Sequence, residues 1–561
     1  MSIADSPKET IGAIFGGNIF QIPSYQRKYI WTDKECGDLW NDIEEAVKNS
    51  MNHFFGTLIF REIESEGLAT LQSYEIIDGQ QRITTLYILL SELISKLPDS
   101  KIKDSLREKF IGSPGNLKLS PQGKDIDFLD ELVFKFDSID ESVLRKRSQR
   151  LMFKTKKYFR SILSSYSQEE IEKKIVFIQK NIEVLILNVK RQSEAIRMFE
   201  IINDRGLPLK ILDKCKSVLM LYSTMYLDEK LNDVINNAFE KVYDSFDDII
   251  MDRDRLKILG RFSENTLFTH HYSSARKLFQ ETWDFKKGAE SIFEDLKSKC
   301  ESLKRDRKKL SEFIKNYADD FSEFSLSYAD LVSSIETNEL YVKPFQFLEF
   351  TATLYPLIVR LHNQKKLGAL LKELESIEVR IYKFRGTNPV KDAYVLSSLI
   401  SEDELDTDVI KKELIDFNNR FMNDGNFRYY LNSAVYGNTA TIKYIFLEYN
   451  NSLKSCRIIN DVNEYRKLEV EHIFSRNPNF SVKSYGFKDD EYENEINKIG
   501  NLTLLERDTS NASPKDKADR YIKSDTCMTN RLGSKIKSEG FTKKEMDERG
   551  EELIRFCLKR F

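Results

Sequence analysis

The residues best suited to chemistry gather near the C-terminal end of the chain, around one histidine. The 561-residue sequence contains five histidines, and His472 directly follows an acidic residue, Glu471. Asn501 and Asn511 come next, after two runs of β-type residues. Hydrolysis of a phosphodiester needs a base that activates water, a divalent cation at the leaving oxygen and a group that fixes the tautomer of the base. These four residues can supply all three functions.

Each of the four has an expected role. His472 is the candidate general base, and Glu471 and Asn511 offer oxygen ligands that suit Mg²⁺ or another divalent cation. Asn501 can hydrogen-bond to imidazole and backbone, so we expect it to orient His472. The plainer alternative is a structural histidine at a strand edge, with asparagines that cap turns. In a regular strand Glu471 and His472 point to opposite faces, so both can serve one metal site only where the strand ends or bends.

Two strand-like runs and a helix are expected to position these residues. Residues 468–474 and 499–505 are the predicted strands, and lysine-rich helical sequence follows Ser513 and Pro514. Lys515 and Lys517 lie just past Asn511 in this helix, where they can meet DNA phosphate charge. The order of elements is β-β-α in one short segment.

A second motif lies near the N-terminus, where a strand-like run is followed by an Asp-Gly-Gln-Gln-Arg string and a helix. Helix N-termini attract phosphate, and glycine allows close backbone approach. The arginine can pair with phosphate oxygens, and a glutamine can position water. The alternative is a turn with an ordinary capped helix. This candidate nucleotide site consists of Asp78, Gly79, Gln80, Gln81 and Arg82.

The remaining predicted elements divide the chain into three parts. Residues 54–60, 74–77 and 182–189 are expected strands, and helices are expected at 83–97 and 194–202. Residues 219–405 are almost wholly helical in pattern, with charge runs that indicate solvated faces. Strands that feed helices predict an α/β or α+β domain at the N-terminal end.

Composition narrows the range of functions. The net charge is -3 and the pI about 6.2, so any contact with DNA must be local rather than spread over the whole surface. None of the six cysteines forms a Cys-x-x-Cys pair, and we expect reduced thiols in a cytoplasmic protein. No apolar run approaches the roughly 20 residues of a membrane span. His270 and His271 lack acidic partners at ligand spacing, so we expect them at the surface.

The C-terminal residues resemble a known family. Glu471-His472-Ile473, the run 499–505, Asn511 and Lys515 look like the ββα-metal HNH nuclease domain of GmrSD-like type IV, modification-dependent restriction enzymes. The tail after Phe541 resembles the closing helix of that domain. The resemblance implies that the acid and the last asparagine hold the metal, that the histidine is the base and that the middle asparagine orients it. The sequence departs from the family where Ser475 replaces a frequent proline and where the acid is Glu rather than Asp.

The N-terminal third resembles the ParB-like NTPase domain of the same enzymes. The Asp78–Arg82 string is the family signature, and it is intact here. Two further elements match, Tyr-Gln-Arg before the string and Asn-x-Arg-Gly after it, with Asp213 following. The resemblance implies that this domain binds a nucleoside triphosphate and gates the nuclease. Further nucleotide-binding residues on these elements are Tyr25, Gln26, Arg27, Asn203 and Arg205.

The sequence therefore predicts a multidomain, mainly α protein with α+β ends. We expect a ParB-like α/β NTPase domain at 1–220, a helical middle region at 221–409 and a ββα-metal HNH nuclease domain at 410–561. The expected function is an NTP-regulated, metal-dependent endonuclease that restricts phage double-stranded DNA bearing modifications, with no membrane partner. The alternatives are a nucleotide-binding adaptor whose HNH-like part binds DNA without cutting, and an RNA-directed nuclease. Formation of a homo-oligomer stays open.

Overall fold

The computed structural model describes residues 8–561, except for 24–25, 64–71, 122–124, 145, 192–193, 195–209, 251–258, 261, 403–404, 489–490 and 507–511. The chain forms two compact units. One comprises Met1–Met251 with Gly288–Ser322, and the other comprises Asp252–Lys287 with Glu323–Phe561. Both are mostly helical. The division of the chain into the three domains expected from sequence stays a prediction.

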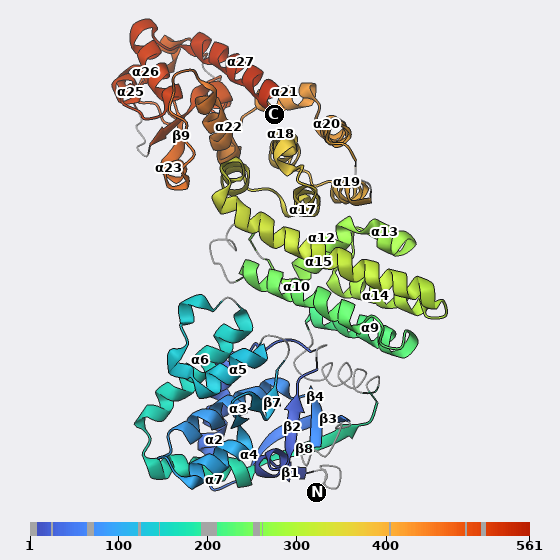
Figure 1. Ribbon diagram of the computed structural model, residues 1–561. Coiled ribbons are helices and arrows are strands. Elements are labelled where there is room, and N and C mark those ends of the chain that lie inside the picture. The colour runs from blue at the N-terminus through green and yellow to red at the C-terminus, as the bar shows by residue number, and fades with distance from the viewer. Residues whose placement is uncertain are drawn as a thin grey trace. The chain divides into compact units, whose positions relative to one another are not determined.

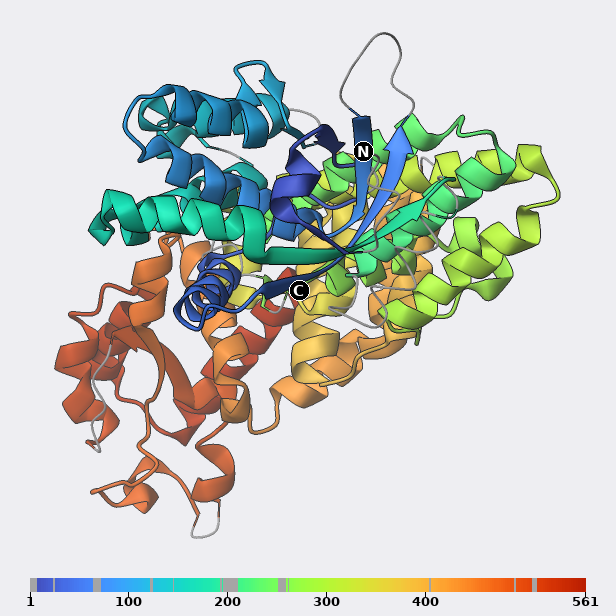
Figure 2. The ribbon, with the colours of Figure 1, turned by 90° about the horizontal axis from the view of Figure 1, so that it is seen from below.

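A six-stranded mixed sheet forms the centre of the N-terminal part. Its strand order is β1-β8-β3-β4-β2-β7. Strands β3 and β8 are parallel, as are β2 and β4, whereas β3 and β4 are antiparallel. Figures 1 and 2 show helices of the first 190 residues lying beside this sheet. The strands are β1 (Lys8–Thr10), β2 (Asn18–Gln21), β3 (His53–Ile63), β4 (Gln72–Asp78), β7 (Leu119–Ser120) and β8 (Ile182–Val189).

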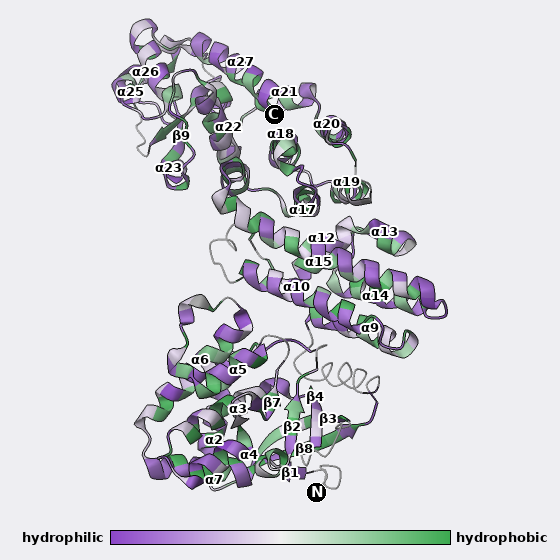
Figure 3. Cartoon of the chain, viewed as in Figure 1, coloured by the Kyte–Doolittle hydropathy of each residue, from purple (hydrophilic) through white to green (hydrophobic). Residues whose placement is uncertain are grey.

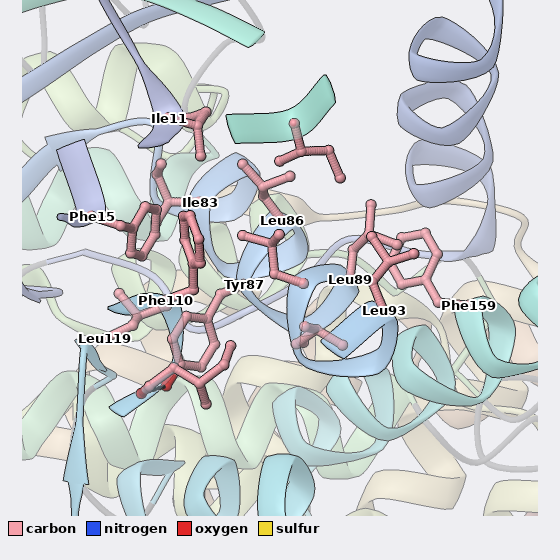
Figure 4. Packing of buried hydrophobic residues seen from close by; sticks show 14 of the residues in the cluster. Ile11, Phe15, Ile83, Leu86, Tyr87, Leu89, Leu93, Phe110, Leu119 and Phe159 are labelled. Carbon is pink, nitrogen blue, oxygen red and sulfur yellow. Dashed lines mark hydrogen bonds between the residues drawn. The ribbon is translucent and has the colours of Figure 1, made fainter. Parts of the chain in front are cut away.

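Helix α3 (Gln80–Ser95) is the buried core helix of this part of the chain. Gly79, directly after β4, is its N-cap. Nearly all of its side chains are buried because apolar residues surround the helix rather than forming one stripe. Figure 4 shows Leu86 and Leu93 of α3 among the core residues, with Phe159 of a neighbouring helix close by. The strands expected near 54–60, 74–77 and 182–189 and the helix expected at 83–97 are confirmed.

Further helices pack around this core and extend beyond it. Those of the first unit include α2 (Asp33–Lys48), α6 (Arg147–Ile162), α7 (Gln168–Asn181), α9 (Ile211–Tyr226) and α10 (Asn232–Ile250). In Figure 3 such helices carry alternating hydrophobic and hydrophilic bands, as expected where one side of a helix is buried. The helix expected at 194–202 lies almost wholly outside the described residues.

The helical pattern expected after residue 219 is confirmed through the middle of the chain. The helices there include α12 (Glu264–Ser274), α15 (Arg307–Thr337), α17 (Tyr355–Asn363), α18 (Leu367–Ile377), α19 (Val390–Glu402) and α20 (Thr407–Met422). Among the described residues, no helix is long and apolar enough to cross a membrane.

The surface position expected for His270 and His271 is wrong. Both are buried within α12, and the His270 ring stacks 6.0 Å from the ring of Tyr328. Burial lowers the pKa of His270 to about 4. The last five residues of α12, His270–Ser274, are all buried, so the polar residues there do not reach solvent. Nothing in the local sequence reveals that enclosure.

The C-terminal part contains a two-stranded hairpin and a group of helices. Strands β9 (Leu468–His472) and β10 (Leu502–Glu506) pair antiparallel, and helix α25 (Pro514–Tyr521) follows them. A small apolar core that includes Ile473, Phe474 and Tyr521 lies beside the hairpin. The predicted β-β-α order is confirmed, although the strands are shorter than expected. Helices α22 (Thr439–Ser452), α26 (Cys527–Glu539) and α27 (Lys543–Arg560) complete this part.

A disulfide joins Cys456 to Cys527, which corrects the expectation that all cysteines are reduced. The Cα atoms are 5.9 Å apart although 71 residues separate the two positions in sequence. The first residue of α26 lies beside the loop that follows α22, so folding brings together two cysteines whose spacing carries no signal. The other four cysteines are buried free thiols.

Candidate active site

The β9–β10 hairpin positions Glu471 and His472 at the end of a strand. β9 ends at His472, which pairs with Leu502, and Glu471 pairs with Thr503. The strand therefore ends at His472, which meets the condition under which Glu471 and His472 can serve one site. Both residues are buried, with exposed fractions of 8% for Glu471 and 6% for His472.

The His472 imidazole is held by an asparagine that the sequence reasoning missed. Nε2 of His472 lies 3.0 Å from Oδ1 of Asn497, and the ring centroid lies 4.2 Å from that of Tyr436. Because an amide oxygen only accepts, Nε2 carries the proton and Nδ1 keeps a lone pair. Burial lowers the pKa of His472 to about 4, and the nearby charges of Arg476 and Lys517 act in the same direction. A neutral imidazole with a free Nδ1 lone pair can accept a proton from water.

Asn501 has a different role from the one expected. Its side chain accepts a hydrogen bond from the Phe474 backbone N–H at 2.7 Å and donates to the carbonyls of Phe474 and Ile496. No hydrogen bond between Asn501 and His472 occurs in the described part of the chain. Asn501 is fully buried and fixes the path of the chain directly after His472. It therefore positions the backbone, and Asn497 takes the contact with the ring.

Lys517 also differs from its expected position. It is 3% exposed, its Nζ lies 3.0 Å from Oε1 of Glu471, and it donates to the His472 carbonyl at 2.7 Å. In this arrangement Lys517 compensates the buried carboxylate rather than facing DNA, because its place on α25 turns it toward the hairpin. Lys515, two residues earlier, is exposed. Asn511 lies outside the described residues.

The donor set around Glu471 fits a lightly coordinated hard cation. Within the described ranges, no group of three or more His, Cys, Asp or Glu residues is arranged so that it could hold a metal ion. Mg²⁺ commonly binds through one or two protein carboxylates and completes its shell with water and substrate phosphate. Glu471 supplies one such carboxylate, and a cation bound there would compete with the ammonium of Lys517 for it.

Helix α27 holds the turn that leads into β10. Nη1 of Arg549 donates to the carbonyls of Gly500 at 2.9 Å and Leu502 at 2.7 Å. Gly500 lies so close to α27 that a Cβ there would come within 2.2 Å of the Met546 carbonyl oxygen. This glycine is required because helix and turn touch backbone to backbone. The Gly-Asn-Leu run noted in the sequence is thus a packing contact as well as a motif.

At the N-terminal motif, Arg82 contacts protein rather than open space. Its guanidinium donates to the carbonyls of Phe55 and Thr57, both at 2.8 Å, and to Asp78 at 3.1 Å. The two carbonyls lie in β3 at the point where its register with β8 shifts. Burial raises the pKa of Asp78 and lowers the pKa of Arg82, while their mutual attraction opposes both shifts. The expected phosphate contact of Arg82 would compete with these bonds.

The two glutamines of the motif bind the loop that carries the Tyr-Gln-Arg element. Gln80 donates to the Arg27 carbonyl at 3.0 Å, and Gln81 donates to the Lys28 carbonyl at 3.1 Å. In return, Gln26 donates to the carbonyl of Ile77 at 2.8 Å, in the strand before the motif. The structure thus brings these two predicted elements together around a cavity of about 20 Å³. Tyr25, Asn203 and Arg205 lie outside the described residues.

Acidic residues face the basic groups beside this cavity. Arg27 lies 3.9 Å from Asp213, which brings a third predicted element to the same place. Lys28 lies 2.7 Å from Asp244 and 3.6 Å from Glu240, both on α10. The cations that could bind phosphate are therefore paired with carboxylates in this conformation. A cavity of this size has no room for a triphosphate unless the carboxylates or the loop move.

Two family matches cover most of the chain. Residues 11–220 match the sequence model described as GmrSD restriction endonuclease, N-terminal domain. Residues 421–556 match that described as GmrSD restriction endonucleases, C-terminal domain. The first match spans the sheet and the motif at Asp78–Arg82, and the second spans the hairpin with Glu471 and His472. No curated protein matches the chain.

Proposed function

Since the chain belongs to the GmrSD family of type IV restriction endonucleases, we propose that it cuts modified foreign DNA at a metal-dependent centre formed by Glu471 and His472. The observation that carries this proposal is the His472 imidazole, which is neutral, fixed by Asn497 through Nε2 and left with its Nδ1 lone pair. That arrangement is what a general base requires. The proposed centre is HNH-like, with strand β9 ending at His472 and helix α25 following the hairpin.

In the proposed reaction His472 takes a proton from water through Nδ1 while the water oxygen attacks the phosphorus. The bond from phosphorus to the leaving sugar oxygen breaks, and that oxygen takes a proton from solvent. Asn497 holds the ring in the required tautomer, and Asn501 keeps the following backbone in place. Glu471, with Asn511, would hold the divalent cation, which when bound stabilises charge on the leaving oxygen. Lys517 forms an ion pair with the Glu471 carboxylate, so it competes with the cation and lowers the affinity of that carboxylate for it.

The test is cleavage of modified and unmodified phage DNA by the full chain, with Mg²⁺ or with a chelator. His472→Ala should lower the rate by about 10²–10⁴, the usual contribution of a general base, while the fold is retained. His362→Ala is the matched control, because His362 pairs with Asp330 away from the centre. Full cleavage by His472→Ala would refute the assignment, and no cleavage by the wild type with any substrate would favour the DNA-binding adaptor instead.

We further propose that a nucleoside triphosphate binds beside the Asp78–Arg82 motif and regulates cutting. This proposal is supported by the convergence of the motif, the Arg27 loop and Asp213 on one place, with cations and carboxylates in close pairs. Arg27→Gln should weaken triphosphate binding, since a charge-assisted contact is lost. Hydrolysis measured with and without DNA, and cutting measured with and without each triphosphate, test the coupling. Unchanged rates in both comparisons would mean that the two activities are independent.

A further inference from the structure

A groove of about 530 Å³ lies between α22, α26 and α27, on the C-terminal part of the chain. This volume is within the range of ligand-binding pockets. Neither Glu471 nor His472 lines the groove, so it is distinct from the candidate active site.

Four basic side chains line the groove: Arg531, Lys535, Arg549 and Arg555. Across the described residues, none of the four has a carboxylate oxygen within ion-pair distance. By contrast, Lys537 on the same helix as Lys535 pairs with Asp519 at 2.6 Å. The four basic residues, two on α26 and two on α27, outnumber the three glutamates that also line the groove, so the lining carries a net positive charge that favours an anion.

Arg549 also has a buried donor. Its Nη1 is used by the carbonyls of the turn before β10, but its Nη2 is buried with no hydrogen-bond partner among the described residues. A buried unsatisfied donor on a charged group is costly, so an acceptor that reached Nη2 from the groove would stabilise it. Burial lowers the pKa of Arg549 to about 10, while the nearby Tyr449, Glu552 and Tyr521 act in the opposite direction.

The rest of the lining suits a ring and its polar groups. Leu453, Met528, Leu532 and Phe541 provide an apolar surface, and Tyr449 an aromatic one. Three glutamates, at positions 545, 548 and 552, also line the groove and can accept hydrogen bonds from amines or hydroxyls. The groove thus offers cations for phosphate, an apolar face for a ring and acceptors for exocyclic donors.

We propose that this groove binds a single nucleotide, with its phosphate on the four cations and its base against the apolar lining. The same chemistry is available from a free mononucleotide and from a nucleotide turned out of duplex DNA. The proposal goes beyond the proposed cutting function and does not depend on which residues form the catalytic centre. Arg549 would connect the bound phosphate to the turn that leads into β10.

The test uses two double variants of the full chain with equal charge change on the same two helices. Lys535→Gln with Arg555→Gln removes two exposed cations from the groove, and Lys537→Gln with Lys559→Gln removes two from elsewhere on α26 and α27. Binding is measured by calorimetry with deoxycytidine 5′-monophosphate, with deoxycytidine and with a short duplex of modified phage sequence. Cleavage at saturating DNA is followed in parallel.

The groove variant should bind a phosphate-bearing probe at least about tenfold more weakly than the wild type, from the loss of charge-assisted contacts. The control variant should stay within about twofold. Weakening for the monophosphate identifies a free ligand, and weakening for the duplex alone identifies a nucleotide within DNA. If both variants weaken binding equally, the cause is general attraction of DNA to positive charge. If neither weakens binding, the groove binds none of the probes. Either result overturns the proposal. Loss of cutting with unchanged binding of both probes would also count against it.

Discussion

Asn497→Ala is the most direct perturbation of the candidate active site that leaves every proposed catalytic group in place. The change removes the acceptor 3.0 Å from Nε2 of His472, whose side chain is buried. Water cannot easily replace the lost partner, so the unsatisfied donor costs about 1–3 kcal/mol. If that free energy holds the ring in its working tautomer and orientation, the rate of cleavage falls by about 5- to 150-fold.

Asn497→Asp is the matched variant, because it keeps an oxygen acceptor at the same place. A carboxylate beside the ring also favours the proton on Nε2. We therefore expect Asn497→Asp to cut within about fivefold of the wild type, whereas Asn497→Ala does not. The backbone carbonyl of Asn497, which accepts a hydrogen bond from the Val435 N–H, is unaffected by either change.

The assay is single-turnover cleavage with enzyme in excess over DNA and saturating Mg²⁺, so that the observed rate reports the chemical step. Thermal unfolding of each variant separates a loss of catalysis from a loss of fold. A folded Asn497→Ala that cuts within twofold of the wild type would refute the role of Asn497. Asn497→Asp as slow as Asn497→Ala, with both folded, would refute the idea that an oxygen acceptor is what matters.

Three further predictions follow from contacts around the two sites. Lys517→Met should lower the free energy of unfolding by about 3–5 kcal/mol in denaturant titrations, because it leaves the Glu471 carboxylate buried and unpaired. Adding Glu471→Gln to this variant should recover much of that loss, and no recovery would contradict the ion-pair explanation. Gly500→Ala should destabilise the fold by about 1–3 kcal/mol through the clash with α27, and an unchanged melting temperature would mean that the helix and turn can separate freely. Glu240→Gln with Asp244→Asn should tighten triphosphate binding about two- to fivefold, because Lys28 loses its competing carboxylates; weaker binding in a titration would show that α10 supports the site instead.

The elements that carry both candidate sites could be predicted from sequence because their signals are local. The β-type run at 182–189 and the enclosed apolar helix after the Asp78–Arg82 motif follow from residue periodicity over one element. The β-β-α order near the C-terminus follows in the same way. The two motifs were identifiable because unusual polar residues follow strand-like runs at short spacing. Neither inference needed knowledge of what the elements pack against.

The partners of individual side chains depended on the tertiary structure. Asn497 and Asn501 are four residues apart, and only the path of the turn before β10 decides that Asn497 reaches the His472 ring while Asn501 holds the backbone. Lys515 and Lys517 are two residues apart on one helix, about 200° around its axis, so one faces solvent and the other faces Glu471. Sequence spacing carries no information about which side of that helix meets the hairpin.

The sequence by itself determined which elements form and which residues could do chemistry, because both depend on residue type and on neighbours within a few positions. Only the tertiary structure decided that Cys456 meets Cys527, that His270 and His271 are buried, and that Lys28 beside the N-terminal motif is paired with acidic residues of α10. These contacts join residues from tens to hundreds of positions apart. They exist only once packing of the apolar cores has fixed the positions of the helices, and that packing is a property of the whole fold.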